Sequence, residues 1–171
     1  MPIDDATLSK SKRKPRTTEE LSHLASKNGS LFYELAMMLE AEKLWNRAKQ
    51  QRDSTYNMAI ECFLLHFRNL RDFLYPSPGA WTNQFYFDDV IANDFWSEWR
   101  SVYEDWTECS ADEKSRIDKL LAHLSYSRPS LDHAWPIPKM STAIQNALAE
   151  FLTSLPDERK EWFTAIKIDR P

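Results

Sequence analysis

Glycine is scarce in this chain, with two residues among 171. Tight hairpins and phosphate-cradling loops use glycine, because it adopts backbone conformations that other residues avoid. The scarcity therefore argues against β-rich folds and against P-loop or dinucleotide-binding folds. An all-α fold is the expectation that remains.

Cysteine and long apolar runs are scarce as well. The two cysteines, Cys62 and Cys109, show no close metal-ligand spacing. No uninterrupted apolar run approaches the roughly 18 residues that span a bilayer, and the N-terminus lacks the charged-then-apolar order of a secretory signal. We therefore expect a soluble cytoplasmic protein with reduced thiols, no cofactor and no membrane contact.

Positive charge is concentrated at the N-terminus. Residues 1–16 carry five basic and two acidic residues, a balance of +3, and because the whole chain has a formal net charge of −4, residues 17–171 carry −7. An acidic body argues against a broad surface for duplex DNA, whose binding depends on neutralising phosphates. The basic run at residues 10–16 would suit a nucleic-acid arm or a targeting tag. We interpret residues 1–16 as a disordered tail, because chain termini are usually loose.

The chain does contain a large apolar fraction, 42% of its residues, and 13% are aromatic. This composition suits a single helical domain with a substantial core over residues 17–171. At Asn28-Gly29-Ser30 we expect a C-cap glycine followed by an N-cap serine. Apolar residues at three- and four-residue intervals and the positions of prolines predict five helical regions. They are residues 17–51, which are broken at 28–30, then 54–75, a helix that begins near 110 or 112 and ends at 126, 139–155, and 156–166.

Aromatic residues crowd the segment between the second and third long helices. Periodicity is poor over residues 76–110, which predicts an ordered irregular loop with one or two short helices, one of them over 88–95. The aromatics between Trp81 and Trp106 would suit base stacking, as in single-strand binders, or the filling of a core. The core is the simpler explanation in a helical domain.

Arg116 and His123 form the most informative pair in the sequence. A separation of seven residues places two side chains within about 20° around a helix and roughly 10 Å apart along its axis. Lys119 lies near the same side, and Tyr126 within about 60° of His123. A guanidinium and an imidazole on one face can hold a phosphodiester and move a proton. An ordinary solvated helix face would show the same pattern.

A polar stripe on the 54–75 helix offers supporting residues. Glu61, Arg68 and Asp72 lie within about 60° of one another, opposite the apolar stripe. They would form a solvent-facing ladder of charges. Alternatively, the stripe faces the third long helix, where Glu61 or Asp72 would orient His123 or pair with Arg116.

Two further polar residues are interpreted as structural. His66 lies at the border of the apolar face of its helix, where a packed, hydrogen-bonded histidine is the usual finding. Asp118 points roughly 160° away from Arg116 on a straight helix, so we do not expect the two to share a contact. The sequence also has no nucleophile elbow and no His-Glu-x-x-His zinc motif.

The run Arg116-Ile117-Asp118-Lys119-Leu120-Leu121-Ala122-His123 resembles the signature of the HEPN (higher eukaryotes and prokaryotes nucleotide-binding) superfamily, in particular its abortive-infection type. The preceding segment, residues 57–73, is similar to the helix before that motif in small bacterial HEPN-like proteins. The resemblance covers roughly residues 30–155. Active members commonly carry a polar residue directly after the arginine, where this chain has Ile117.

The resemblance implies a four- to five-helix bundle that often forms a homodimer, with two copies of the motif building one ribonuclease site. It implies a metal-independent endoribonuclease in which His123 is the general acid/base and Arg116 the phosphate clamp. An RNA-cleaving or RNA-binding role in stress response, toxin–antitoxin systems or phage defence would follow. Because other members are catalytically inactive, the alternative is a helical module that dimerises or docks a protein partner.

Overall fold

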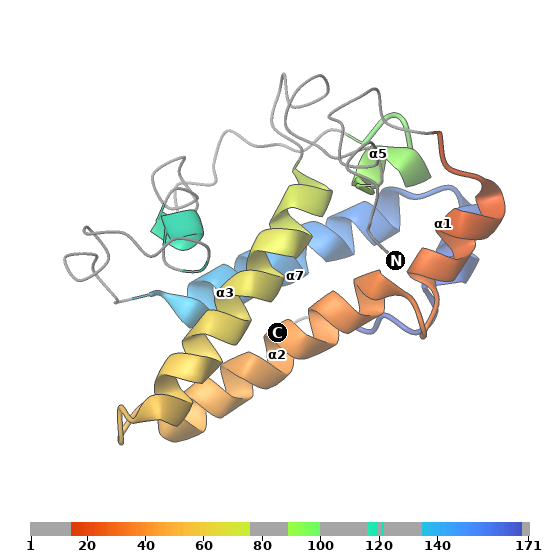
Figure 1. The fold of residues 1–171 in the computed structure, drawn as a ribbon. Helices are drawn as coiled ribbons and strands as arrows, with labels where there is room; N and C mark the ends of the chain where they lie inside the picture. The colour runs from red at the N-terminus through yellow and green to blue at the C-terminus, as the bar shows by residue number, and fades with distance from the viewer. Residues whose placement is uncertain (1–14, 76–88, 100–115, 120, 122–134, 169–171) are drawn as a thin grey trace, which may run out of the picture.

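The computed structural model describes residues 15–75, 89–99, 116–119, 121 and 135–168. Every regular element within these residues is helical, which confirms the predicted all-α class (Figure 1). The long helices are α2, Ser30–Ala48, α3, Ser54–Leu74, and α7, Ile137–Ser154. Shorter elements are α1, Thr18–Ala25, α5, Ala92–Phe95, α8, Asp157–Lys160, and the 3₁₀ turn η5, Glu161–Phe163.

The first helix begins where the sequence indicates. Thr17 is the N-cap of α1: its side chain accepts a hydrogen bond from the Glu20 backbone N–H, 3.2 Å, and the Glu20 carboxylate accepts from the Thr17 N–H, 2.8 Å. This reciprocal capping box satisfies two backbone donors that a helix start would otherwise leave unpaired. Just before it, at the end of the predicted tail, Arg16 donates a hydrogen bond to the backbone carbonyl of Asp89, 3.1 Å.

The break between the first two helices differs from the prediction by three positions at the C-cap and by one at the N-cap. Helix α1 ends at Ala25 with Ser26 as its C-cap, and Gly29 is the N-cap of α2 rather than the C-cap of α1. A glycine that ends a helix usually adopts the left-handed conformation, whereas Gly29 is extended, with φ −85° and ψ 162°. Glycine is needed for close packing here, since a Cβ atom on Gly29 would lie 2.1 Å from the backbone oxygen of Leu24. Ser30, expected to be an N-cap, is the first helical residue.

Helices α2 and α3 form the largest helix–helix contact, and α3 also packs against α7 (Figure 1). Asp53 caps the start of α3 by accepting a hydrogen bond from the Tyr56 N–H, 3.1 Å. The predicted apolar stripe of α3 is buried except at Tyr56, which is half-buried. Helix α2 is tied to α7 by buried Ser141, whose hydroxyl donates to the Glu42 carboxylate, 2.5 Å.

Aromatic rings make up the centre of the core. Phe151 of α7 is fully buried and makes edge-to-face contacts with four other rings. The ring centroids lie 5.3 to 6.3 Å from that of Phe151, and the partners are Phe73, Phe95, Trp99 and Phe163. Edge-to-face pairs at this spacing add to the free energy of burial.

The described part of the predicted aromatic segment packs inward. Helix α5 falls within the short helix expected over 88–95, and Phe95 and Trp99 are both buried. Trp99 Nε1 donates a hydrogen bond to the Leu74 backbone oxygen, 2.7 Å, at the end of α3. These rings fill the core, as the simpler interpretation expects. Residues 76–88 and 100–110 lie outside the described part.

Candidate functional site

The segment that carries Arg116 is helical and anchored in the core. Residues 116–119 and 121 are helical, and Ile117 is fully buried. Arg116 is half-buried, and its guanidinium carbon lies 4.4 Å from the centroid of the Trp135 ring. This is the geometry of a cation–π contact. Arg116 is therefore held by an aromatic side chain that comes from the start of α7.

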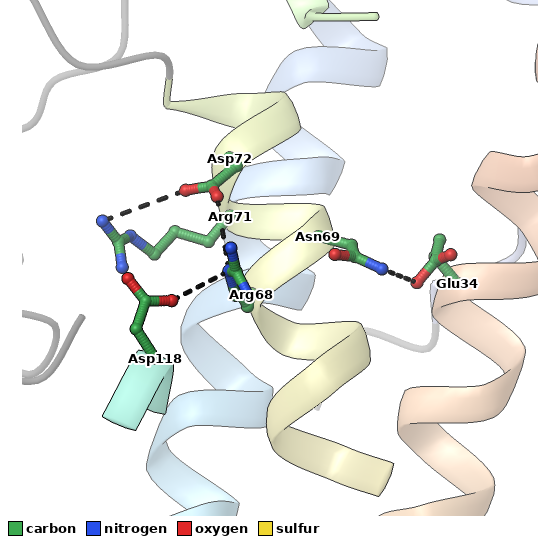
Figure 2. A network of polar contacts seen from close by, with 6 residues as sticks. All are labelled: Glu34, Arg68, Asn69, Arg71, Asp72 and Asp118. Atoms are coloured by element: carbon green, nitrogen blue, oxygen red, sulfur yellow. Dashed lines mark hydrogen bonds and ion pairs between the residues drawn. The ribbon is translucent and has the colours of Figure 1, made fainter. Parts of the chain in front are cut away.

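Asp118 joins the same segment to α3. Its Oδ1 atom lies 3.1 Å from Arg68 Nε, while Arg68 Nε lies 3.9 Å from Asp72 Oδ2 within α3 (Figure 2). Asp118 Oδ1 accepts no hydrogen bond, so the contact with Arg68 acts through charge. About a third of each side chain is exposed, which screens the pair, and such pairs contribute at most about 1 kcal/mol.

Arg71 is the buried member of this group of charges. Its side chain is 4% exposed, and its Nη2 atom lies 4.0 Å from Asp72 Oδ1 (Figure 2). A buried guanidinium is costly unless charge and hydrogen bonds compensate it. Arg68 thus connects the stripe on α3 to Asp118. That Glu61 or Asp72 orients His123 or pairs with Arg116 stays a prediction.

The structure places part of the predicted site. Arg116 contacts Trp135, and Asp118 contacts Arg68. Lys119 is exposed on the same segment, and Glu61 is exposed on α3. The predicted His123 and Tyr126 lie outside the described residues.

A second polar cluster joins α2 to α3. His66 is 5% exposed, and its Nδ1 atom lies 2.7 Å from a carboxylate oxygen of Glu34. The same oxygen of Glu34 accepts a hydrogen bond from Asn69 Nδ2, 3.0 Å (Figure 2). The ring of Tyr33 meets the His66 ring edge to face, 5.6 Å between centroids. His66 is thus the packed, hydrogen-bonded histidine that the sequence indicates.

Cys62 lies one helical turn before His66. Burial raises the pKa of this thiol above its ordinary value, and the negative charge of Glu34 raises the pKa further. Because the thiolate is the reactive form, a raised pKa makes a nucleophilic role unfavourable. Among the described residues, no group of three or more His, Cys, Asp or Glu side chains could hold a metal ion.

Trp135 and Glu34 are the residues that sequence reasoning missed. Trp135 stands just before Pro136, in a stretch without periodicity, so no local pattern indicates its contact with Arg116. Glu34 meets His66 across 32 positions of sequence. The spacing of residues along the sequence does not indicate contacts between distant segments.

Comparisons with known proteins identify no family for this chain. No protein-family model, no curated protein and no solved structure matches this chain. Within the described residues, no helix has both the length and the apolar character to cross a bilayer. The class established for the protein is therefore an all-α fold.

Proposed function

We propose that this chain is a HEPN-like protein that binds and cleaves RNA without a metal ion. The contact between Arg116 and Trp135 is the observation that supports the proposal most: Arg116 is half-buried, its guanidinium lies against the Trp135 ring, and the adjacent Ile117 is fully buried. A cation that is in place before the substrate arrives stabilises developing negative charge without reorganisation. Arg116 would bind the scissile phosphate, and Lys119, which is exposed on the same segment, would add positive charge.

The reaction proposed is attack of a ribose 2′-hydroxyl on the adjacent phosphorus. His123 takes the 2′-hydroxyl proton as the new oxygen–phosphorus bond forms. The bond from phosphorus to the 5′-oxygen breaks, and this oxygen gains a proton from the imidazolium of a second copy of the motif. The products are a 2′,3′-cyclic phosphate and a 5′-hydroxyl end.

The setting of this activity is proposed on the resemblance alone. We propose a cytoplasmic homodimer in which two motifs build one site, acting in a toxin–antitoxin, phage-defence or stress response. An antitoxin or another protein partner would bind it. Light scattering on the purified protein tests the dimer, because a monomer at micromolar concentration would contradict a composite site.

A matched set of variants tests the catalytic role. Purified wild type, Arg116→Ala, His123→Ala and Arg159→Ala are incubated with total RNA in EDTA. Arg159 is the control, because its guanidinium carbon also stacks on a tryptophan, 4.2 Å from the ring of Trp162. We expect wild type and R159A to cleave, and both site variants to lose about 100-fold or more in rate. A wild type without activity, or four equally active proteins, would refute the proposal.

A catalytically inactive helical module is the second candidate. It is supported by the packing of the segment that carries Arg116, because Ile117 is fully buried and Asp118 pairs with Arg68. In that case Arg116→Ala would lower the free energy of unfolding while wild type neither binds nor cleaves RNA. The variant set above separates the two functions, since urea denaturation of the same proteins reports the stability.

A further inference from the structure

We propose that Trp135 is a positioning residue that fixes the guanidinium of Arg116 for binding phosphate. The inference rests on the proposed function and deepens it, because it names the residue that orients the phosphate-binding group. Trp135 itself touches no substrate in this account. It acts through the face of its indole ring.

The position of the ring is set by the start of α7. Trp135 is 8% exposed, and its backbone oxygen accepts a hydrogen bond from the Ile137 N–H, 2.8 Å. Ile137 is fully buried, and Pro136 between them has a restricted backbone angle. The ring therefore belongs to the rigid part of the fold. Arg116 reaches it from a separate segment, so the contact restricts a side chain that is otherwise rich in rotamers.

The choice of tryptophan is informative because its polar atom is unused. Trp135 Nε1 is buried and has no hydrogen-bond partner in the described structure. A buried indole N–H usually finds a partner, since an unsatisfied donor is unfavourable. Phenylalanine would fill most of this space without that cost. Tryptophan gives the strongest cation–π contact of the aromatic residues, and the guanidinium at 4.4 Å makes that contact.

Substitution of Trp135 should affect the stability of the fold and the cleavage of RNA differently. Trp135→Phe removes the unsatisfied donor but leaves a small cavity, and because the two effects oppose each other the thermal midpoint should change little. The ring of phenylalanine holds the guanidinium less strongly, so kcat/KM for RNA cleavage should fall by about 2- to 5-fold. Trp135→Met removes the aromatic face and should lower kcat/KM by about 3- to 30-fold, the range of measured cation–π contacts. A purely structural role would move stability and activity together.

A double-variant cycle tests whether Trp135 acts through Arg116. We measure kcat/KM in EDTA for wild type, W135F, W135M, R116A and R116A/W135M, with Trp162→Met as control because it removes the matched ring under Arg159. The expected result is that W135M lowers kcat/KM in wild type and causes no further loss in R116A, while W162M has no effect. Interaction through one residue is what makes such losses non-additive.

The outcomes separate the two proposals. A wild type that does not act on RNA refutes the proposed function and this inference with it. An active wild type in which the losses of W135M and R116A add refutes the inference alone. If W135M does not unfold cooperatively, Arg116→Lys takes its place as the test. A loss of kcat/KM as large as that of R116A supports the positioning of a planar guanidinium. Near-normal kcat/KM shows that positive charge alone suffices and overturns the inference.

Discussion

Replacing Ile117 by alanine tests whether the segment that carries Arg116 is packed into the core. Ile117 is fully buried, and the substitution removes three carbon atoms. At about 0.8 kcal/mol for each buried carbon, the transfer contribution is about 2.4 kcal/mol. The cavity left behind adds to this, and measured Ile-to-Ala losses run to about 2–5 kcal/mol. We expect a loss of about 3 kcal/mol in the free energy of unfolding.

Urea denaturation followed by circular dichroism measures this loss. With a slope of about 2 kcal/mol per molar urea, the midpoint should fall by about 1.5 M. Lys119→Ala is the matched control, because Lys119 lies on the same segment and is exposed, and it should change stability by less than about 0.5 kcal/mol. Equal urea midpoints for the two variants would refute the packing of this segment into the core. They would also refute the placement of Arg116 that depends on this packing.

Three further predictions address single contacts. Gly29→Ala should cost about 1–3 kcal/mol in urea denaturation, because its Cβ would overlap a backbone oxygen; a neutral variant would contradict this packing. Trp99→Phe should cost about 1–3 kcal/mol by leaving the Leu74 carbonyl unpaired, and an unchanged thermal midpoint would count against the bond. Glu34→Gln removes a charge that raises the pKa of the Cys62 thiol, so this pKa should fall and alkylation at pH 8 should quicken, as measured by peptide mass spectrometry. Slower or unchanged alkylation would argue against that influence.

Local patterns in the sequence predict the described helices well. Thr17 and Glu20, three residues apart, each accept a hydrogen bond from the other's backbone N–H. The buried apolar residues of α3 recur every three or four positions. Both depend on the geometry of one helix, so neighbouring residues contain the information. The prediction that Gly29 is a C-cap was wrong, because α1 ends three positions earlier, at Ser26, and Gly29 has the extended backbone of an N-cap.

The candidate site is less predictable because its contacts join distant segments. Arg68 meets Asp118 across fifty positions, and Arg116 meets Trp135 across nineteen. The angular separation of Arg116 and Asp118 concerns one helix and stays a prediction. It does not predict which side chain each of them meets, because that depends on how α3 and the start of α7 are placed in the fold.

Cleavage of a matched pair of RNA oligonucleotides is the most direct test of the central claim that Arg116 and His123 act together on RNA. One oligonucleotide is all ribose, and the other carries a 2′-deoxy sugar at the mapped cleavage position. In EDTA, wild type should cut the first to a 2′,3′-cyclic phosphate end and leave the second intact at that position, and neither R116A nor H123A should cut either. Cleavage of the deoxy substrate there, or equal activity of both variants and wild type, would contradict the account.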